Sequence, residues 1–233
     1  MRIVFNLRRL VIVPILLVLA SPVSATNQNH PLPKVSGNVD YVVKRNGGPI
    51  GTLKIAFKRD GNRLVATSHY SIKVKLMAIV LYRYDKRMVE TYEDGQLIAY
   101  SADIDDNGTN STVQVTRKDG ALSIVHPKGT LTAPLGTMPS TYWAPATVAQ
   151  TRLIDSSDGV FLNVKTVEAA TEDLTVDSRT IRAKRYQMSG EAERQLWYDA
   201  KSGVWLKMKL KGSDGSTIEI ERDWAPVWKS GLL

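Results

Sequence analysis

Hydrophobic and polar residues alternate along much of this chain with a period of two. In the stretch 53–58, Leu53, Ile55 and Phe57 alternate with polar or small residues, including lysines at positions 54 and 58. The stretches 39–44 and 70–76 repeat the pattern, with an apolar or tyrosine side chain at every second position. Because successive side chains of a β-strand point to opposite faces, this pattern predicts strands with one buried face each.

Asparagine–glycine and aspartate–glycine pairs separate such stretches. Glycine accepts the positive φ of a tight turn, and asparagine or aspartate tolerates it, so these pairs are typical of β-hairpins. They stand at 46–47, 60–61, 94–95, 107–108, 119–120, 158–159 and 214–215. We therefore predict a mainly β fold, an antiparallel meander of about ten to thirteen strands that forms an open or closed barrel-like sheet. One short helix is expected from about Pro145 to Leu153, since proline suits a first helical turn.

The clearest strand of the second half of the chain covers residues 204–211. Val204, Leu206, Met208 and Leu210 occupy one set of alternate positions, and Trp205 shares the other set with three lysines. We predict that this strand pairs across the turn at 214–215 with residues 217–222.

The first 25 residues predict a cleavable signal peptide. Three arginines without an acidic residue precede the apolar segment 10–20, and Val23-Ser24-Ala25 has the small residues that signal peptidase requires. The apolar segment is shorter than a permanent membrane helix, and without cysteine there is no lipoprotein anchor. We expect a periplasmic or secreted protein whose mature chain has no transmembrane helix.

The mature chain is expected to form one domain. Residues 26–37 are polar and proline-rich and predict a flexible N-terminal arm. The single β domain then covers 38–233, with a first lobe over 38–136, a hub and helix over 137–153, and a second lobe over 154–233.

Charge and composition exclude several function classes. The formal charge of +8 falls to +5 without the arginines of the signal peptide, and no run of five like charges occurs. This surplus gives no reason to expect nucleic-acid binding and supports at most a peripheral contact with anionic envelope polymers or headgroups. The absence of cysteine excludes disulfides and cysteine-based metal sites. We expect no cofactor, and the sequence does not indicate an oligomeric state.

The alternation stops at residues 136–145, where two prolines, three serine or threonine residues and an aromatic pair come together. Ser140 is the best-placed nucleophile candidate, but its context differs from the G-x-S-x-G motif, so we favour a role as the cap of a helical turn. Tyr142 and Trp143 each combine a large apolar face with a polar tip. They suit the wall of a ligand-binding cleft or a plug that seals one end of a barrel, and we interpret the stretch as the joint between the two lobes. No catalytic residue is assigned.

The longest apolar run of the mature chain covers Leu76 to Tyr82. Seven residues is an ordinary length for a buried strand, which we favour. The alternative is an apolar lip at which a lipid-like ligand enters. In that case Leu76, Ile79 and Leu81 are candidate ligand contacts.

The segment 103–108 matches the first half of a calcium-binding loop. Asp103, Asp105 and Asn107 stand at positions one, three and five of the D-x-D-x-N-G pattern. Position twelve is Gln114 in place of the bidentate glutamate. A hairpin turn with solvated acidic residues is therefore the favoured interpretation, and these three residues are a weak metal-site candidate.

Three motifs carry a resemblance to a family of secreted bacterial proteins of unknown function. They are a Tyr…Gly-x-x-x-Gly opening, a Pro-Ser/Thr-x-Tyr-Trp centre and a Trp-Tyr-Asp…Gly-x-Trp close. The matching residues are Tyr41, Gly47, Gly51, Pro139, Ser140, Tyr142, Trp143, Trp197, Tyr198, Asp199, Gly203 and Trp205. The resemblance implies an antiparallel, barrel-like envelope protein and supplies no activity. In layout the chain is also distantly similar to periplasmic half-barrel proteins that hold lipids or lipoproteins, a likeness of fold alone.

These features lead to three functional hypotheses. The first is a non-catalytic periplasmic protein that binds an apolar or amphipathic small molecule in a barrel-like cavity. The second is a structural or interaction module of the cell envelope. The third is an envelope hydrolase with a site near Tyr142 and Trp143.

Overall fold

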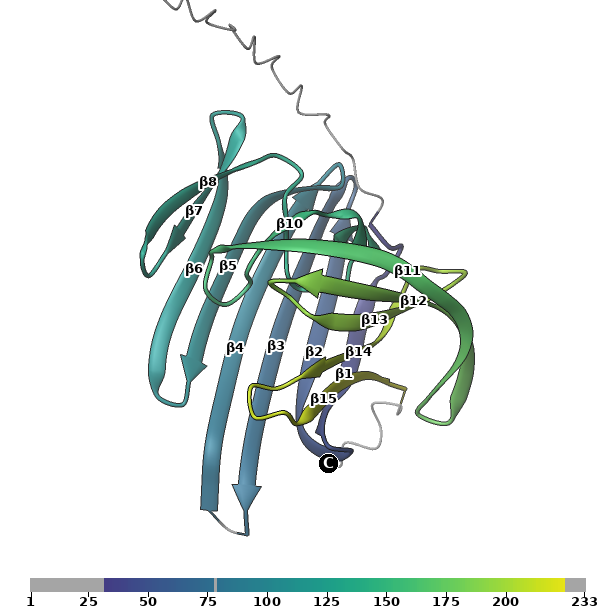
Figure 1. Cartoon of the computed structure of the whole chain (residues 1–233). Coiled ribbons are helices and arrows are strands. Elements are labelled where there is room, and N and C mark those ends of the chain that lie inside the picture. Colours follow the sequence, from purple (N-terminus) through teal and green to yellow (C-terminus); the bar gives the residue numbers. More distant parts are fainter. Residues whose placement is uncertain (1–31, 78, 225–233) are drawn as a thin grey trace, which may run out of the picture.

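The computed structural model describes residues 32–77 and 79–224, so the expected signal peptide and half of the expected arm lie outside the described residues. In the described part the chain forms fifteen β-strands and one short 3-10 helix, η1 (Figure 1). The elements are β1 (Gly37–Arg45), β2 (Gly48–Asp60), β3 (Arg63–Leu76), β4 (Ile79–Glu93), β5 (Gln96–Asp106), β6 (Thr109–Lys118), β7 (Ala121–His126), β8 (Gly129–Pro134), β9 (Met138–Pro139), η1 (Pro145–Ala149), β10 (Arg152–Ile154), β11 (Phe161–Val176), β12 (Arg179–Gly190), β13 (Arg194–Asp199), β14 (Trp205–Lys211) and β15 (Thr217–Asp223).

All fifteen strands belong to one sheet with the order β8-β7-β6-β5-β4-β3-β2-β1-β15-β14-β13-β12-β11-β10-β9. The chain builds one half as a meander from β1 to β8, continues to β9 at the opposite edge, and returns strand by strand to pair β15 with β1. Neighbouring strands are antiparallel except β9 and β10, which are parallel. The predicted mainly β, barrel-like fold is confirmed. The sheet is open because β8 and β9 are its two edges, and it has more strands than the ten to thirteen expected.

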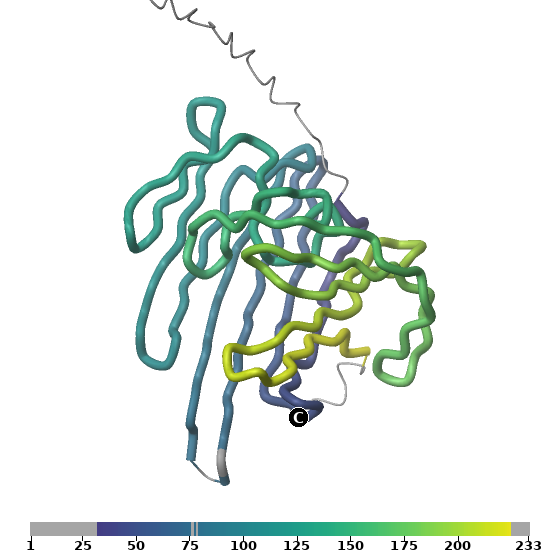
Figure 2. The backbone as a smooth tube through the Cα atoms, viewed as in Figure 1, coloured from purple at the N-terminus to yellow at the C-terminus, as the bar shows by residue number. Residues whose placement is uncertain are grey.

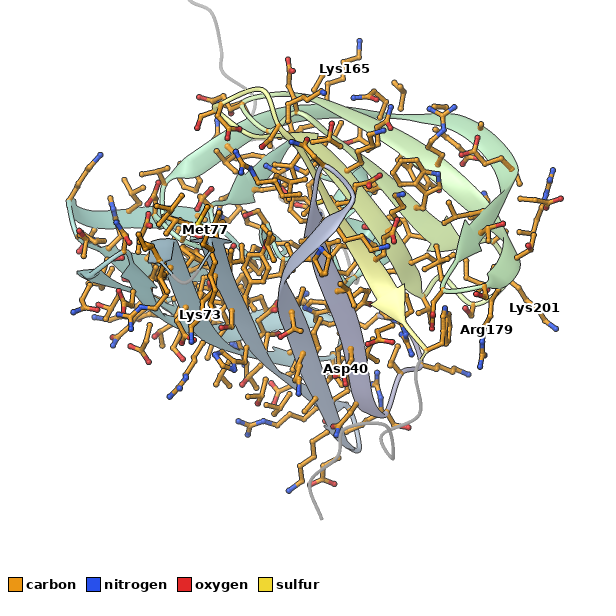
Figure 3. The ribbon with its side chains drawn as sticks, turned by 90° about the horizontal axis from the view of Figure 1, so that it is seen from below. Asp40, Lys73, Met77, Lys165, Arg179 and Lys201 are labelled. Carbon is orange, nitrogen blue, oxygen red and sulfur yellow. The ribbon has the colours of Figure 1, made fainter. Side chains whose placement is uncertain are left out.

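The sheet curls so that β11, β12 and β13 cross in front of the long strands β1–β5 (Figures 1 and 2). Viewed from below, the early strands and the late strands lie on opposite sides of the interior (Figure 3). The inward faces of both halves form one hydrophobic core. The predicted alternation of β2 is confirmed, since Leu53, Ile55 and Phe57 are buried while Lys54 and Lys58 are exposed.

The helix predicted for about 145–153 is shorter than expected. Only Pro145–Ala149 is helical, as a 3-10 turn, and Arg152–Ile154 is strand β10 between β9 and β11. Leu153 and Ile154 are fully buried at this edge of the sheet, so strand pairing and burial outweigh the helical signal of the proline. The prediction that Ser140 caps a helical turn is also wrong, because Ala144 is the N-cap residue and no side chain caps the helix.

A β-bulge interrupts the alternation of faces along β14. The pairing of β13 with β14 shifts between Trp197 and Tyr198, so Leu206 is an extra residue opposite them. As a result Trp205 is buried in the main core, and Leu206 is buried with Trp197 in a second, smaller cluster on the other face. Met208 returns to the main core.

No helix between residues 32 and 224, leaving aside residue 78, has the length and apolarity that crossing a membrane requires.

Candidate functional site

A cavity of about 710 Å³ lies between the two halves of the sheet. Strands β2, β3 and β4 line one side of it, and β14 and β15 line the other. The hub stretch and the loop between β10 and β11 contribute residues 140–142 and 155–157. Much of the wall is apolar and includes Leu53, Ile72, Met88, Met208, Leu210 and Ile220.

The inner face of β4 brings both apolar and charged side chains to this region. Because alternate residues of a strand share a face, Tyr84, Lys86 and Met88 point inward and line the cavity. The same row continues with Glu90 and Tyr92, which are buried in the core beyond the cavity. A single strand thus carries two buried ionisable groups four residues apart.

Lys86 is buried at the cavity wall with an exposed fraction of 6%. Its ammonium group donates hydrogen bonds to the hydroxyl oxygens of Ser156 at 2.9 Å and Ser157 at 3.0 Å. Burial lowers the pKa of Lys86 from 10.5 to about 8, although the carboxylates of Asp155 and Glu90 partly offset this effect. The amine therefore remains mostly charged at neutral pH.

Arg194, the first residue of β13, is the second cation of the cavity wall. Its guanidinium lies 4.6 Å from the centre of the Tyr142 ring, and Nη1 is 3.9 Å from the sulfur of Met208. The buried Nε atom has no hydrogen-bond partner. The positive charge is near enough to Lys86 to contribute to the lowering of the pKa of that lysine.

Ser140 and Tyr142, two of the sequence candidates, both line the cavity. The Ser140 hydroxyl accepts a hydrogen bond from the backbone N–H of Ser156 at 3.0 Å and lies 3.3 Å from the Ser156 hydroxyl. Tyr142 has a positive φ of 62°, an uncommon backbone conformation for a residue other than glycine. Its carbonyl accepts a 2.8 Å hydrogen bond from the Tyr198 hydroxyl, which fixes the turn against β13.

Trp143, the third hub candidate, packs in the core beside the cavity and is 2% exposed. Its indole N–H donates to Glu90 Oε1 at 2.7 Å, while Tyr92 and Thr141 donate hydroxyl hydrogen bonds to Glu90 Oε2 at 2.7 and 3.2 Å. The Trp143 ring also makes edge contacts with Phe57 and Tyr92. Burial raises the pKa of Glu90 from 4.5 to about 6, against the opposing effect of these three hydrogen bonds.

The favoured interpretation of residues 76–82 as a buried strand is wrong. The run covers the ends of β3 and β4 and the turn between them, and this hairpin extends below the other strands (Figures 1 and 2). Ile79 is 66% exposed and Leu81 is 55% exposed, and Met77, labelled in Figure 3, is 94% exposed. Leu81 lines the cavity. Leu76 ends β3, and its side chain lies outside the described part of the chain.

The candidate calcium segment forms the hairpin between β5 and β6. Asp105 accepts the backbone N–H of Gly108 at 2.7 Å through Oδ1 and is ion-paired with Arg83 through Oδ2. Asn107 occupies the turn with a φ of 53°, and Asp103 is exposed on β5. Among the described residues no group of three or more histidine, cysteine or acidic side chains is arranged to hold a metal ion.

Residues from the three sequence motifs meet in space. The Tyr41 hydroxyl donates to the carbonyl of Trp205 at 3.1 Å, and the two ring centres are 4.6 Å apart. The bond from Tyr198 to Tyr142 joins the closing motif to the central one. At Gly51 an added Cβ would stand 2.1 Å from the carbonyl oxygen of Ser71, so only glycine allows β2 and β3 to approach so closely there.

Sequence reasoning missed the charged residues of the site. Lys86 and Glu90 share the inward row of β4 with Tyr84 and Met88, so the period-two pattern of residues 82–92 contained a signal for both. Arg194 had no such signal, because it stands at the beginning of a strand after a polar turn.

Comparison with known proteins agrees with this architecture. A crystal structure of a beta-barrel-like protein of domain of unknown function DUF1849 from Brucella abortus is similar to the chain, with a TM-score of 0.58 and 11% sequence identity. The similarity covers 84% of this chain and 98% of that protein, and at this identity it shows the fold alone. No curated protein sequence matches the chain. Residues 41–223 match the model of the family Domain of unknown function (DUF6134), and the chain therefore belongs to that family.

Proposed function

We propose that this protein is an exported, non-catalytic protein that binds an apolar or amphipathic small molecule in the cavity between the two halves of its sheet. The observation that carries this proposal is the cavity of about 710 Å³ with its largely apolar wall. Ligand pockets of proteins typically have volumes of roughly 300–1,000 Å³, are mostly apolar and contain a few placed polar groups.

The surroundings of the cavity support a preformed site. Trp205 lines the cavity, is 1% exposed and is held against Tyr41, and Tyr142 is held by Tyr198. Side chains fixed in this way lose little freedom when a ligand binds, which favours affinity. The exposed apolar hairpin next to Leu81 offers a path by which an apolar molecule can reach the interior.

The hydrolase alternative gains no support from Ser140. Its hydroxyl is hydrogen-bonded to Ser156, and within the described residues no histidine is hydrogen-bonded to it. A serine nucleophile needs an adjacent general base to be activated.

The test is a binding measurement with an uncharged fluorescent apolar probe such as 1-N-phenylnaphthylamine. Ile72 lines the cavity and Lys73, its neighbour on β3, is exposed on the other face, so Ile72→Trp and Lys73→Trp form a matched pair. We expect Ile72→Trp to weaken probe binding about tenfold or more by filling the cavity, and Lys73→Trp to leave it unchanged. Melting temperatures report whether both variants are folded. Absence of probe binding to the folded wild-type protein, or equal binding by both variants, would contradict the proposal.

A further inference from the structure

The cavity has a polar base and a largely apolar wall, and the ion pair of Arg45 and Asp214 lies at its outer end. Lys86, Arg194 and the serines at 140, 156 and 157 line the base. Along β4 the wall runs from Lys86 past Tyr84 to Leu81 near the hairpin. Lys86 and Leu81 are five residues apart, which corresponds to about 16 Å at the usual rise per residue of a strand. The shape suits a molecule with a small polar head and an extended apolar tail.

The hydrogen bonds of Lys86 leave capacity for a further acceptor. A lysine ammonium group has three donors, and the two hydrogen bonds described for Lys86 both run to neutral serine hydroxyls. Lys86 takes part in none of the ion pairs of the described residues. A buried cation without a paired anion is costly, because burial removes the water that would solvate its charge.

Arg194, which is partly buried, also lacks an ion pair in the described part of the chain. Its Nε is buried without a hydrogen-bond partner, and it belongs to none of the ion pairs of the described residues. The Tyr142 ring and the Met208 sulfur hold the guanidinium at the cavity wall without neutralising its charge. Guanidinium and ammonium groups are the usual partners of carboxylates and phosphates.

The carboxylates of Asp155 and Glu90 attract Lys86, but neither forms an ion pair with Lys86 or Arg194 among the described residues. Asp155 also lines the cavity, but its Oδ1 accepts the backbone N–H groups of Ser157 at 2.7 Å and Asp158 at 2.9 Å. Arg45, at the opposite end of the wall, is ion-paired with Asp214. The base of the cavity therefore carries two cations and one carboxylate that is engaged in a turn.

We propose that the ligand is an anionic amphiphile, a molecule with a carboxylate or phosphate head group and an alkyl tail. Lys86 and Arg194 bind the head group at the base of the cavity, and the tail lies along β3 and β4 toward Leu81. This inference rests on the proposed function, since it specifies the ligand of the same cavity.

The expected selectivity follows from the charges. An anionic head group accepts hydrogen bonds from the free donors of both cations and also compensates their charge. An alcohol can accept hydrogen bonds but carries no charge, so it should bind more weakly. An amine head group would place a third cation beside Lys86 and Arg194, so it should bind more weakly than the alcohol.

The experiment compares four ligands with the same tail: dodecanoate, dodecyl phosphate, dodecanol and dodecylamine. Their affinities for the mature protein are measured at neutral pH by displacement of 1-N-phenylnaphthylamine. We expect one or both anions to bind about tenfold or more tightly than dodecanol, and dodecylamine to bind more weakly than dodecanol. The anion that binds best distinguishes a fatty acid from a phosphate ester as the source of the head group.

Three variants assign the selectivity to the two cations. Lys86→Met and Arg194→Met should each remove most of the anion preference while changing the affinity for dodecanol by less than about threefold. Lys54→Met removes the same charge from the exposed outer face of β2 and should change nothing. Lys86→Arg, which keeps the charge, should retain the preference, and it keeps the test valid if Lys86→Met does not fold.

Equal affinity for dodecanoate, dodecyl phosphate and dodecanol would overturn the proposal of an anionic head group. It would not contradict the proposed binding of a small molecule in the cavity. An equal loss for charged and uncharged ligands in Lys86→Met and Arg194→Met would also overturn it. Failure of the probe and of all four ligands to bind would contradict the proposed function itself.

Discussion

The inner face of β4 carries two buried ionisable residues whose surroundings differ. Glu90 lies in the closed part of the core and accepts three hydrogen bonds from neighbouring side chains. Lys86, four residues earlier, lies at the cavity and is bonded to two serine hydroxyls. The protein itself supplies the hydrogen-bond partners of Glu90, whereas the partners of Lys86 are neutral and no carboxylate of the described residues forms an ion pair with it. This difference distinguishes a charge that holds the fold together from one that is available to a ligand.

The largest expected difference between the two residues is in the free energy of unfolding when each side chain is replaced. Glu90→Ala leaves the donors of Trp143, Tyr92 and Thr141 without their acceptor, so we expect the free energy of unfolding to fall by about 4 kcal/mol. Lys86→Met replaces an unpaired buried cation by an apolar side chain of similar length and should change it by less than about 1 kcal/mol or stabilise the fold. Urea unfolding of the ligand-free proteins measures both values. Equal destabilisation would mean that both residues are structural.

The pH dependence of stability should have opposite signs for the two groups. Because the pKa of Lys86 is lowered from 10.5 to about 8, the unfolded chain binds more protons between these values. Stability should therefore rise with pH in this window, by about 3 kcal/mol. Because the pKa of Glu90 is raised from 4.5 to about 6, its contribution is present below pH 4.5 and is lost as the pH rises through 6. That loss should amount to about 2 kcal/mol.

Difference curves isolate these two effects from the other titrating groups. The stability of the wild-type protein minus that of Lys86→Met should rise between pH 8 and 10.5. The corresponding difference with Glu90→Gln, which mimics the protonated acid, should fall between pH 4.5 and 6. Flat difference curves would show that neither pKa departs from its ordinary value.

The smallest effect is expected at the outer end of the cavity. Leu81 lines the cavity but is 55% exposed, so Leu81→Ser removes only part of a contact with the ligand tail. We expect about threefold weaker binding, equal for dodecanoate and dodecanol, in the displacement assay. Val89→Ser, on an exposed outward position of β4, is the control and should leave binding unchanged. A loss confined to dodecanoate would place the head group at the hairpin instead of at Lys86.

Two stretches of the sequence, 136–145 and 76–82, show which part of the site could be predicted and which could not. Ser140 and Tyr142 line the cavity. They could be predicted because the alternation of strand residues stops around them, among prolines and aromatic residues. The apolar composition and the length of the run 76–82 predict a buried strand, which is wrong. Met77, Ile79, Val80 and Leu81 are exposed because they lie at a hairpin that extends beyond the other strands (Figure 1).

The sequence by itself determined the class of fold. Period-two alternation and Asx-Gly turns act between neighbouring residues, so they specify hairpins without knowledge of the rest of the chain. It also marked the hub as the place where that regularity ends.

The tertiary structure alone decided how the hairpins join into one open sheet with β1 beside β15, and which face of β14 is buried after its bulge. It also decided that Glu90 meets three donors while Lys86 and Arg194 share a cavity wall. The physical reason is that burial, hydrogen bonding and the pKa of a side chain depend on neighbours that are distant in sequence. Local sequence patterns do not indicate which residues these neighbours are.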